Sequence, residues 1–239
     1  MNNPQLPLGL ALRDGARFDG FFPGPNREAV DSLRLASEGQ GELLVFIAGP
    51  AGMGKTHLLQ AACQHASGKR RISSYLPMQQ LSGMVPDVLE GLEQMDLVCL
   101  DDVQLLAGQD AWERALFDLF NRLREAGGTL LVAGERRPDL TGFGLPDLVS
   151  RLGWGVTYVL RPLADTDMLA ALSCRAAGRG LELPEETASF LLKRIPRDPA
   201  TVFDLLDRLD KASMIEQRRL TVPFVKSVLA DMPASQTAS

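Results

Sequence analysis

Cysteine is scarce in this chain, with three among 239 residues. Cys63, Cys99 and Cys174 lie far apart, and no two of them have the CxxC spacing of zinc or redox motifs. A zinc site or a disulfide framework is therefore not expected, and the three cysteines are interpreted as reduced residues in or near the core.

Long hydrophobic runs are also absent. No apolar run approaches the roughly 18 residues that span a bilayer, and the N-terminus lacks the basic-then-hydrophobic order of a signal peptide. The sequence therefore predicts a protein without a membrane segment, and the cytoplasm is the default compartment.

Positive charge is not in excess, because the formal net charge is −5. A protein that coats DNA normally presents a broad basic face, which this composition disfavours. Short basic clusters occur at 69–71, 136–137, 193–197 and 218–219. They are interpreted mainly as solvated helix ends and loops.

Glycine, in contrast, gathers in one informative segment. Residues 49–56 read GPAGMGKT, which fits the P-loop pattern GxxxxGK[ST], and they directly follow the apolar run 43–48. The glycines let backbone N–H groups surround a polyphosphate, Lys55 can reach the β- and γ-phosphates, and Thr56 can coordinate Mg²⁺. A helix expected from Thr56 onward points its positive end at the same site. A glycine-rich turn with a solvated lysine is the alternative, which the flanking strand and helix disfavour. The predicted site for ADP or ATP with Mg²⁺ consists of Gly49, Pro50, Ala51, Gly52, Met53, Gly54, Lys55, Thr56 and His57.

An acidic pair ends a second apolar run. Leu97–Leu100 is followed by Asp101 and Asp102, which is the Walker B pattern. The first carboxylate of such a pair supports Mg²⁺, and the second can orient or deprotonate an attacking water. We assign the metal role to Asp101 and the catalytic role to Asp102; an acidic turn after a buried strand is the alternative. Asp102 is one methylene shorter than the glutamate usual in vigorous ATPases, which predicts slow intrinsic hydrolysis.

The alternation of short apolar runs with amphipathic stretches predicts the fold class. It indicates an α/β domain over 13–163, with a parallel sheet covered by helices on both faces. After Arg161 and Pro162 the strand-like runs stop, which predicts a small helical lid domain over 164–239 with a disordered C-terminal end. Residues 1–12 lack periodicity and are expected to form a flexible tail. The expected strands are 43–48, 72–76, 97–100, 129–133 and 156–160, and the expected helices 56–66, 111–125, 165–177, 184–195, 199–216 and 223–230.

Three segments resemble a known family. GPAGMGKTHL at 49–58, LDDVQLLAG at 100–108 and LVSRLGWG at 148–155 are similar to the AAA+ domain of the bacterial replication initiator DnaA. Nearly the whole chain resembles the Hda family, short DnaA-related AAA+ proteins that inactivate the initiator after replication starts. The resemblance implies an AAA+ P-loop NTPase domain followed by a helical lid, bound ADP or ATP, and DnaA as a partner in the negative regulation of replication initiation.

The resemblance also implies roles for the tail. QLPLGL at 5–10 is similar to the hexapeptide with which Hda and other replication proteins bind the β sliding clamp, with Gln5, Leu6, Leu8 and Leu10 at the matching positions. Clamp binding would bring the protein to DNA indirectly. As a bare pattern, a leucine-dotted tail could instead pack on its own domain.

Arg151 matches the arginine finger of the family. The resemblance implies that its planar, permanently charged guanidinium acts in trans on a nucleotide held by a neighbouring AAA+ subunit. From spacing alone, a surface arginine that caps a helix stays open. The family resemblance also allows a homo-oligomer.

The chain departs from the family at two sensor positions. Glu135 stands at sensor 1 in place of the more usual aspartate, and Ala200 stands at sensor 2, where relatives have an arginine. Arg197 could substitute for the missing cation. The loss of a cation near the γ-phosphate fits stable ADP binding better than self-hydrolysis.

An aromatic cluster precedes the first expected strand. Phe18, Phe21 and Asn26 lie where DnaA-like proteins contact the adenine base, and core packing is an equally weighted alternative.

Three functions follow from these patterns. The leading one is an ADP-bound, clamp-tethered regulator that speeds hydrolysis of DnaA-bound ATP through Arg151. The second is an autonomous ATPase such as a helicase loader, against which Ala200 and the short Asp102 weigh. The third is a sequence-specific DNA-binding initiator, which would need a further helix-turn-helix domain after the lid.

Overall fold

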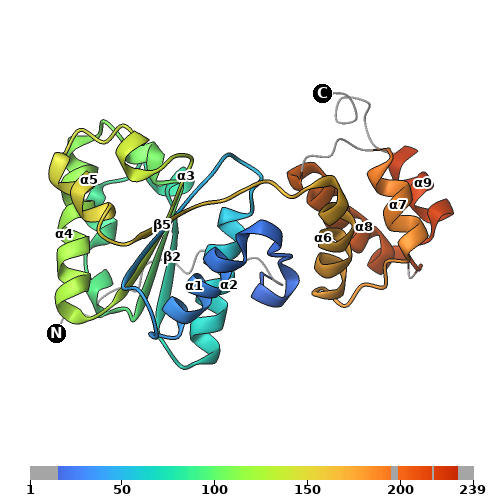
Figure 1. The fold of residues 1–239 in the computed structure, drawn as a ribbon, viewed down its shortest axis with the longest axis horizontal. Coiled ribbons are helices and arrows are strands. Elements are labelled where there is room, and N and C mark those ends of the chain that lie inside the picture. The colour runs from blue at the N-terminus through green and yellow to red at the C-terminus, as the bar shows by residue number, and fades with distance from the viewer. Residues whose placement is uncertain (1–15, 195–198, 217, 231–239) are drawn as a thin grey trace. The chain divides into compact units, whose positions relative to one another are not determined.

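The computed structural model describes residues 16–194, 199–216 and 218–230 (Figure 1). The chain divides into two compact units, one ending at Arg161 and the other beginning at Pro162, with Asp19–Pro25 assigned to the second. The predicted tail motif, with Gln5, Leu6, Leu8 and Leu10, lies outside the described residues.

A five-stranded parallel sheet forms the centre of the first unit. The order is β2-β3-β4-β1-β5, and every neighbouring pair is parallel. The three central strands are buried along their whole length, as expected for continuous apolar runs covered on both faces. The predicted parallel sheet is therefore confirmed, with strands at Leu44–Ala48 (β1), Ser73–Pro77 (β2), Leu97–Asp101 (β3), Thr129–Gly134 (β4) and Val156–Val159 (β5).

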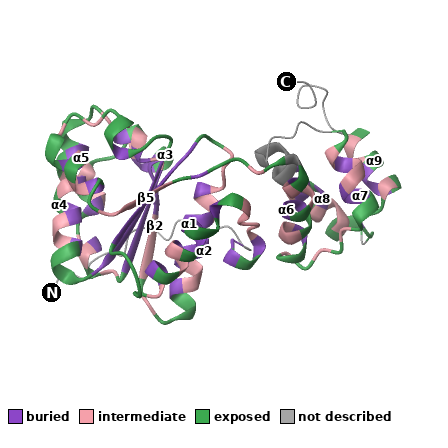
Figure 2. Ribbon diagram, in the orientation of Figure 1, coloured by how far each residue is buried: buried purple, intermediate pink, exposed green. Residues whose placement is uncertain are grey.

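Helices cover both faces of this sheet. In Figure 1, α1 (Arg27–Ser37) and α2 (Lys55–Gly68) lie on one side, and α4 (Asp110–Ala126) and α5 (Pro146–Leu152) lie on the other. The short α3 (Met78–Leu81) follows β2. Figure 2 shows the strands as the most buried part of the unit, between helices that are exposed on their outer faces. Short 3-10 turns complete the connections at Phe18–Gly20, Gly24–Asn26, Pro86–Leu89, Leu92–Gln94, Val103–Leu106 (η5) and Pro138–Leu140.

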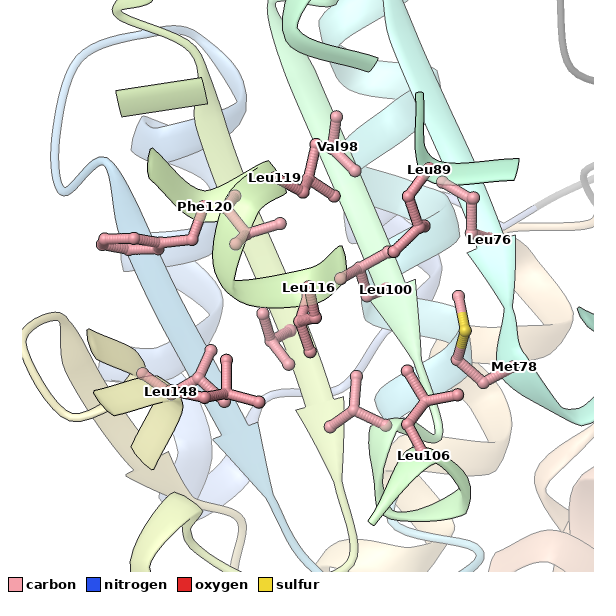
Figure 3. Close-up of a cluster of buried hydrophobic side chains, with 14 of the residues drawn as sticks. Leu76, Met78, Leu89, Val98, Leu100, Leu106, Leu116, Leu119, Phe120 and Leu148 are labelled. Carbon is pink, nitrogen blue, oxygen red and sulfur yellow. The ribbon is translucent and has the colours of Figure 1, made fainter. Parts of the chain in front are cut away.

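The main core lies between α4 and the sheet. Leu116, Leu119, Phe120 and Leu123 recur at helical spacing on α4 and are buried. Figure 3 shows the first three of them directed at the strands, with Leu100 of β3 among the side chains they meet. This packing fixes α4, and with it the loops at both of its ends.

The second unit is a helical bundle with its own core. Its core includes Leu172, Leu191, Leu206 and Phe224, all essentially inaccessible to solvent. The predicted helices 165–177 and 199–216 have the predicted bounds. The helix expected at 184–195 spans 185–192, and the helix expected at 223–230 begins one residue earlier, at 222. The four helices are Asp165–Ala177 (α6), Glu185–Leu192 (α7), Pro199–Glu216 (α8) and Val222–Ala230 (α9). None of the helices in the described part of the chain combines the length and hydropathy needed to cross a membrane.

A segment far upstream belongs to this helical unit. A Cβ atom built on Gly178 would lie 2.7 Å from the Cα of Gly20, so only glycine permits the close approach of the two backbones. The Cys174 thiol donates to the carbonyl oxygen of Asp19 at 3.3 Å. The segment Asp19–Pro25 thus packs on the end of α6, a grouping that differs from the domain range 13–163 expected from the sequence.

Candidate nucleotide site

The candidate site lies at the carboxyl-terminal edge of three adjacent strands. The P-loop follows β1, Asp101 ends β3, and Glu135 follows β4. Because β3, β4 and β1 are neighbours in a parallel sheet, these loops meet at one edge. Ligands of open α/β sheets bind at this edge.

The P-loop has a backbone that depends on glycine. Gly52 and Gly54 have φ angles of 82° and 84°, in the left-handed region that favours glycine. Gly54 directly precedes α2, so the first N–H groups of this helix are available at the loop. The arrangement provides the backbone donors and the helix terminus that a polyphosphate needs.

Lys55 is buried inside the loop, with 6% of its surface exposed. Its Nζ donates to the carbonyl oxygens of Gly49 at 2.6 Å and Pro50 at 2.9 Å. Burial lowers the pKa of Lys55, while Asp102, Asp101 and Glu135 act in the opposite direction. Phosphate oxygens entering the loop could replace the two carbonyl acceptors and would meet a preplaced cation.

Asp101 accepts hydrogen bonds from two hydroxyl groups at one carboxylate oxygen. Thr56 Oγ1 donates to Asp101 Oδ2 at 2.7 Å, and Tyr75 Oη donates to the same atom at 2.8 Å. Burial raises the pKa of Asp101, and the hydrogen bonds from Thr56 and Tyr75 lower it. Two hard oxygen ligands thus lie side by side, which suits Mg²⁺ that is otherwise bound by water and nucleotide phosphates. The described residues contain no cluster of three or more His, Cys, Asp or Glu side chains that could hold a metal ion unaided.

Asp102 is joined to the end of β4 by Gln104. Asp102 has a φ of 58° and directly precedes η5. Gln104 Nε2 donates to Asp102 Oδ1 at 3.2 Å, and Gln104 Oε1 accepts from the backbone N–H of Glu135 at 3.2 Å. The predicted catalytic carboxylate and the predicted sensor 1 position are therefore brought together by one amide that the sequence reasoning did not identify.

The residues before β1 have structural partners. Asn26 donates to the carbonyl oxygen of Arg161 at 2.9 Å and accepts from its N–H at 2.7 Å. Phe18 is buried, with its ring 5.7 Å from that of His65 in an edge-on contact and 5.3 Å from the Arg34 guanidinium carbon. These contacts favour the packing interpretation of Phe18 and Asn26. Phe21 is half-buried in the other unit.

His57, predicted as part of the nucleotide site, lies on α2 two residues after Lys55. Its Nε2 lies 2.9 Å from the carbonyl oxygen of Arg17. The side chain thereby connects Arg17, just before the turn at Phe18–Gly20, to the start of α2.

Arg151 lies in the last turn of α5, away from the P-loop of its own chain. Its guanidinium carbon is 4.2 Å from the ring centroid of Trp154. Trp154 lines a cavity at the amino-terminal edge of the sheet, together with Leu43 before β1 and Gly128 before β4. The P-loop lies at the carboxyl-terminal edge. Arg151 is therefore placed at the opposite end of the sheet from the nucleotide loop of this chain.

Glu113 braces the loop that leads into α5. This carboxylate is 1% exposed and accepts three backbone N–H bonds, from Gly108 at 2.7 Å, Gly144 at 3.0 Å and Leu145 at 2.7 Å. Gly108 ends the segment after the acidic pair, and Leu145 directly precedes α5. One buried carboxyl group thus joins the loop after the acidic pair to the start of the helix that carries Arg151.

The predicted sensor 2 position is only partly described. Ala200 lies in the first turn of α8, and Arg197 lies outside the described residues.

Family models identify the chain. The model for the bacterial DnaA ATPase domain matches residues 12–159, which is more than half of the chain. This chain belongs to that family. The model for the Hda lid domain matches residues 165–229, so the ATPase domain is followed by an Hda-type lid. The resemblance stated from the sequence is confirmed.

Solved structures show the same AAA+ fold. Domain III of the Thermotoga maritima replication initiation protein DnaA has a TM-score of 0.76 at 23% identity, covering 92% of this chain and 98% of that one. AMPPCP-bound DnaA from Aquifex aeolicus has a TM-score of 0.70 at 26% identity, covering 83% of this chain and 66% of that one. The Thermotoga maritima RuvB branch migration motor shares the fold at 17% identity, with a TM-score of 0.58 and coverage of 85% of this chain and 67% of that one.

Proposed function

We propose that this DnaA-related protein binds ADP or ATP with Mg²⁺, is tethered to the DNA-loaded β sliding clamp, and uses Arg151 to promote hydrolysis of DnaA-bound ATP. Its action would prevent re-initiation of DNA replication. The observation that carries the proposal is the position of Arg151 at the sheet edge opposite its own P-loop. This position supports action of the guanidinium on a nucleotide held by another subunit.

The nucleotide site of this chain supports a role in binding nucleotide. Lys55 and the P-loop glycines can bind a diphosphate, and Thr56 with Asp101 can bind its Mg²⁺. The AMPPCP-bound DnaA from Aquifex aeolicus is a nucleotide-bound relative of the same fold. Ala200 at the sensor 2 position removes a cation that would favour ATP over ADP, so we infer that ADP is the resident nucleotide.

The tail supplies the tether. Gln5, Leu6, Leu8 and Leu10 lie outside the described residues, and their role rests on the sequence pattern. An extended segment can present spaced apolar anchors to a groove at modest ordering cost.

A second function is favoured by the intact Walker B carboxylates. Asp101 and Asp102 both lie at the edge that holds the P-loop, as an autonomous ATPase would require. The nucleotide released on denaturing the purified protein separates the two functions. ADP in stoichiometric amount supports the regulator, and an empty site with rapid ATP turnover supports the motor.

The test of the leading function is phosphate release from DnaA–ATP in the presence of DNA-loaded clamp. We expect Arg151→Ala to abolish stimulation, with losses on the order of 10³ as for other trans-acting arginines. Arg136→Ala is the matched control, because it removes an arginine outside α5 and should retain stimulation. If Arg151→Ala stimulates as well as wild type, the assignment of Arg151 is wrong.

A further inference from the structure

Trp154 is an exposed aromatic residue with two guanidinium groups at its ring. It is 56% exposed, whereas Trp112 is 3% exposed. The guanidinium carbon of Arg151 lies 4.2 Å from the Trp154 ring centroid, and that of Arg124 lies 4.6 Å from it. Both distances are within the range of a cation–π interaction. An exposed indole that gathers two cations is not explained by burial of apolar surface.

The indole is held by a ring contact, and the backbone that follows it is held by tight packing. Phe120 on α4 meets it edge to face, with ring centroids 6.5 Å apart. Gly155, the residue after Trp154, lies so close to Leu44 of β1 that any side chain at position 155 would collide with Leu44. Trp154 also forms part of the wall of a cavity of about 230 Å³ at this edge. The ring is therefore a fixed platform, although much of its surface is open.

The two arginines keep their hydrogen-bond donors available. Within the described parts of the chain, neither the Arg124 nor the Arg151 side chain has a hydrogen bond or an ion pair. A cation–π contact uses the face of the guanidinium and leaves the N–H groups on its edge free to bind phosphate oxygens. The ring can thus fix the direction of an arginine without occupying its donors.

We propose that Trp154 is the positioning residue of the arginine finger: its indole holds the Arg151 guanidinium in one orientation, with its donors directed outward to the triphosphate of a partner subunit. Arg124, at the same ring, adds a second positive charge to the surface that meets this anion. The inference rests on the proposed role of Arg151. Its physical basis is preorganisation, because an unrestrained arginine must lose rotamer freedom when it reaches the transition state.

Two substitutions of Trp154 test the proposal in the phosphate-release assay with DnaA–ATP. Trp154→Leu removes the π face and should lower kcat for stimulated hydrolysis about 5-fold, and by no more than about 30-fold, the factors that correspond to a cation–π contact. The concentration of regulator giving half-maximal stimulation should stay unchanged. Trp154→Phe retains an aromatic face and should restore most of kcat. Thermal denaturation and ADP affinity of both variants show whether the fold and nucleotide site are retained.

The outcomes separate the inference from the function on which it rests. If Arg151→Ala loses stimulation while Trp154→Leu retains wild-type kcat, or if Trp154→Leu loses as much as Arg151→Ala, positioning by the indole is wrong and the finger stands. If Arg151→Ala stimulates like wild type, the finger itself is wrong.

Fluorescence quenching tests the contact without any partner. Trp112 is buried, so the emission that iodide can quench comes from Trp154. Two guanidinium groups at the ring should concentrate this anion there, and Arg151→Ala should lower the iodide quenching constant while leaving quenching by neutral acrylamide equal or higher. An unchanged iodide constant in Arg151→Ala would show that the guanidinium does not lie on the ring in solution.

Discussion

Replacing Glu113 should lower the unfolding free energy of the first unit more than replacing any exposed acidic residue on the same helix. The buried Glu113 carboxylate accepts from three backbone donors in part-buried hydrogen bonds, two at Oε1 and one at Oε2. A hydrogen bond to a charged group contributes about 1.5–3 kcal/mol, and part-buried donors left unpaired add to the loss. Glu113→Gln can keep its oxygen at the Oε1 position but sets an NH₂ group against the N–H of Leu145, so we expect a loss of about 1.5–3 kcal/mol. Glu113→Ala removes all three bonds and should lose more than about 3 kcal/mol.

Urea denaturation followed by tryptophan fluorescence measures these losses in the first unit alone. The chain has two tryptophans, Trp112 and Trp154, and both lie in this unit. Glu125→Gln is the matched control, because Glu125 is exposed on the same helix and should change the unfolding free energy by less than about 0.5 kcal/mol. If the unfolding free energies of both Glu113 variants change as little as that of Glu125→Gln, the three hydrogen bonds do not stabilise the first unit.

Three further predictions concern the nucleotide site and the tail. Lys55→Ala should remove ADP binding, and with it the roughly 2.7 kcal/mol by which ligand at a hundredfold excess over its Kd stabilises a protein; unchanged thermal stabilisation by ADP would contradict this. Because burial raises the pKa of Asp101, protonation favours the folded state as pH falls. The unfolding free energy of wild type relative to Asp101→Asn should therefore increase from pH 7 to pH 5 without nucleotide, and a decrease in urea denaturation would refute the assignment. Replacing Leu6 and Leu8 by alanine should abolish clamp binding in surface plasmon resonance but leave ADP affinity unchanged, and wild-type clamp affinity would rule out the tail as tether.

The strands could be predicted from the sequence to within one or two residues. The three central strands, β1, β3 and β4, are largely apolar runs, which is the pattern of a strand buried on both faces. The edge strands β2 and β5 contain Ser and Thr and are less buried. Helix α1 was not predicted, although its buried residues Ala29, Val30, Leu33 and Ala36 have helical spacing. Helix α5 spans only seven residues and gives little periodicity to find.

The residues of the site likewise include some that the sequence predicts and some that it does not. Lys55 and Thr56 belong to a local motif, and the glycines that precede them indicate the backbone conformation of the loop directly. Tyr75, Gln104 and Glu113 escaped prediction because their partners come from other strands and loops. Tyr75 reaches Asp101 only through the pairing of β2 with β3, and Glu113 binds N–H groups 31 and 32 residues away. Such partners become visible only when the sheet has brought the loops together.

The central claim, that Arg151 stabilises the transition state on another subunit, can be measured as a difference of affinities. DnaA loaded with ADP and aluminium fluoride mimics the transferring phosphoryl group, and DnaA–ADP is the ground-state reference. An interaction made only in the transition state should strengthen binding to the mimic alone. We predict that wild type binds the mimic-loaded DnaA more tightly than DnaA–ADP on clamp-loaded DNA, and that Arg151→Ala binds both equally. Equal discrimination by wild type and Arg151→Ala would contradict the account.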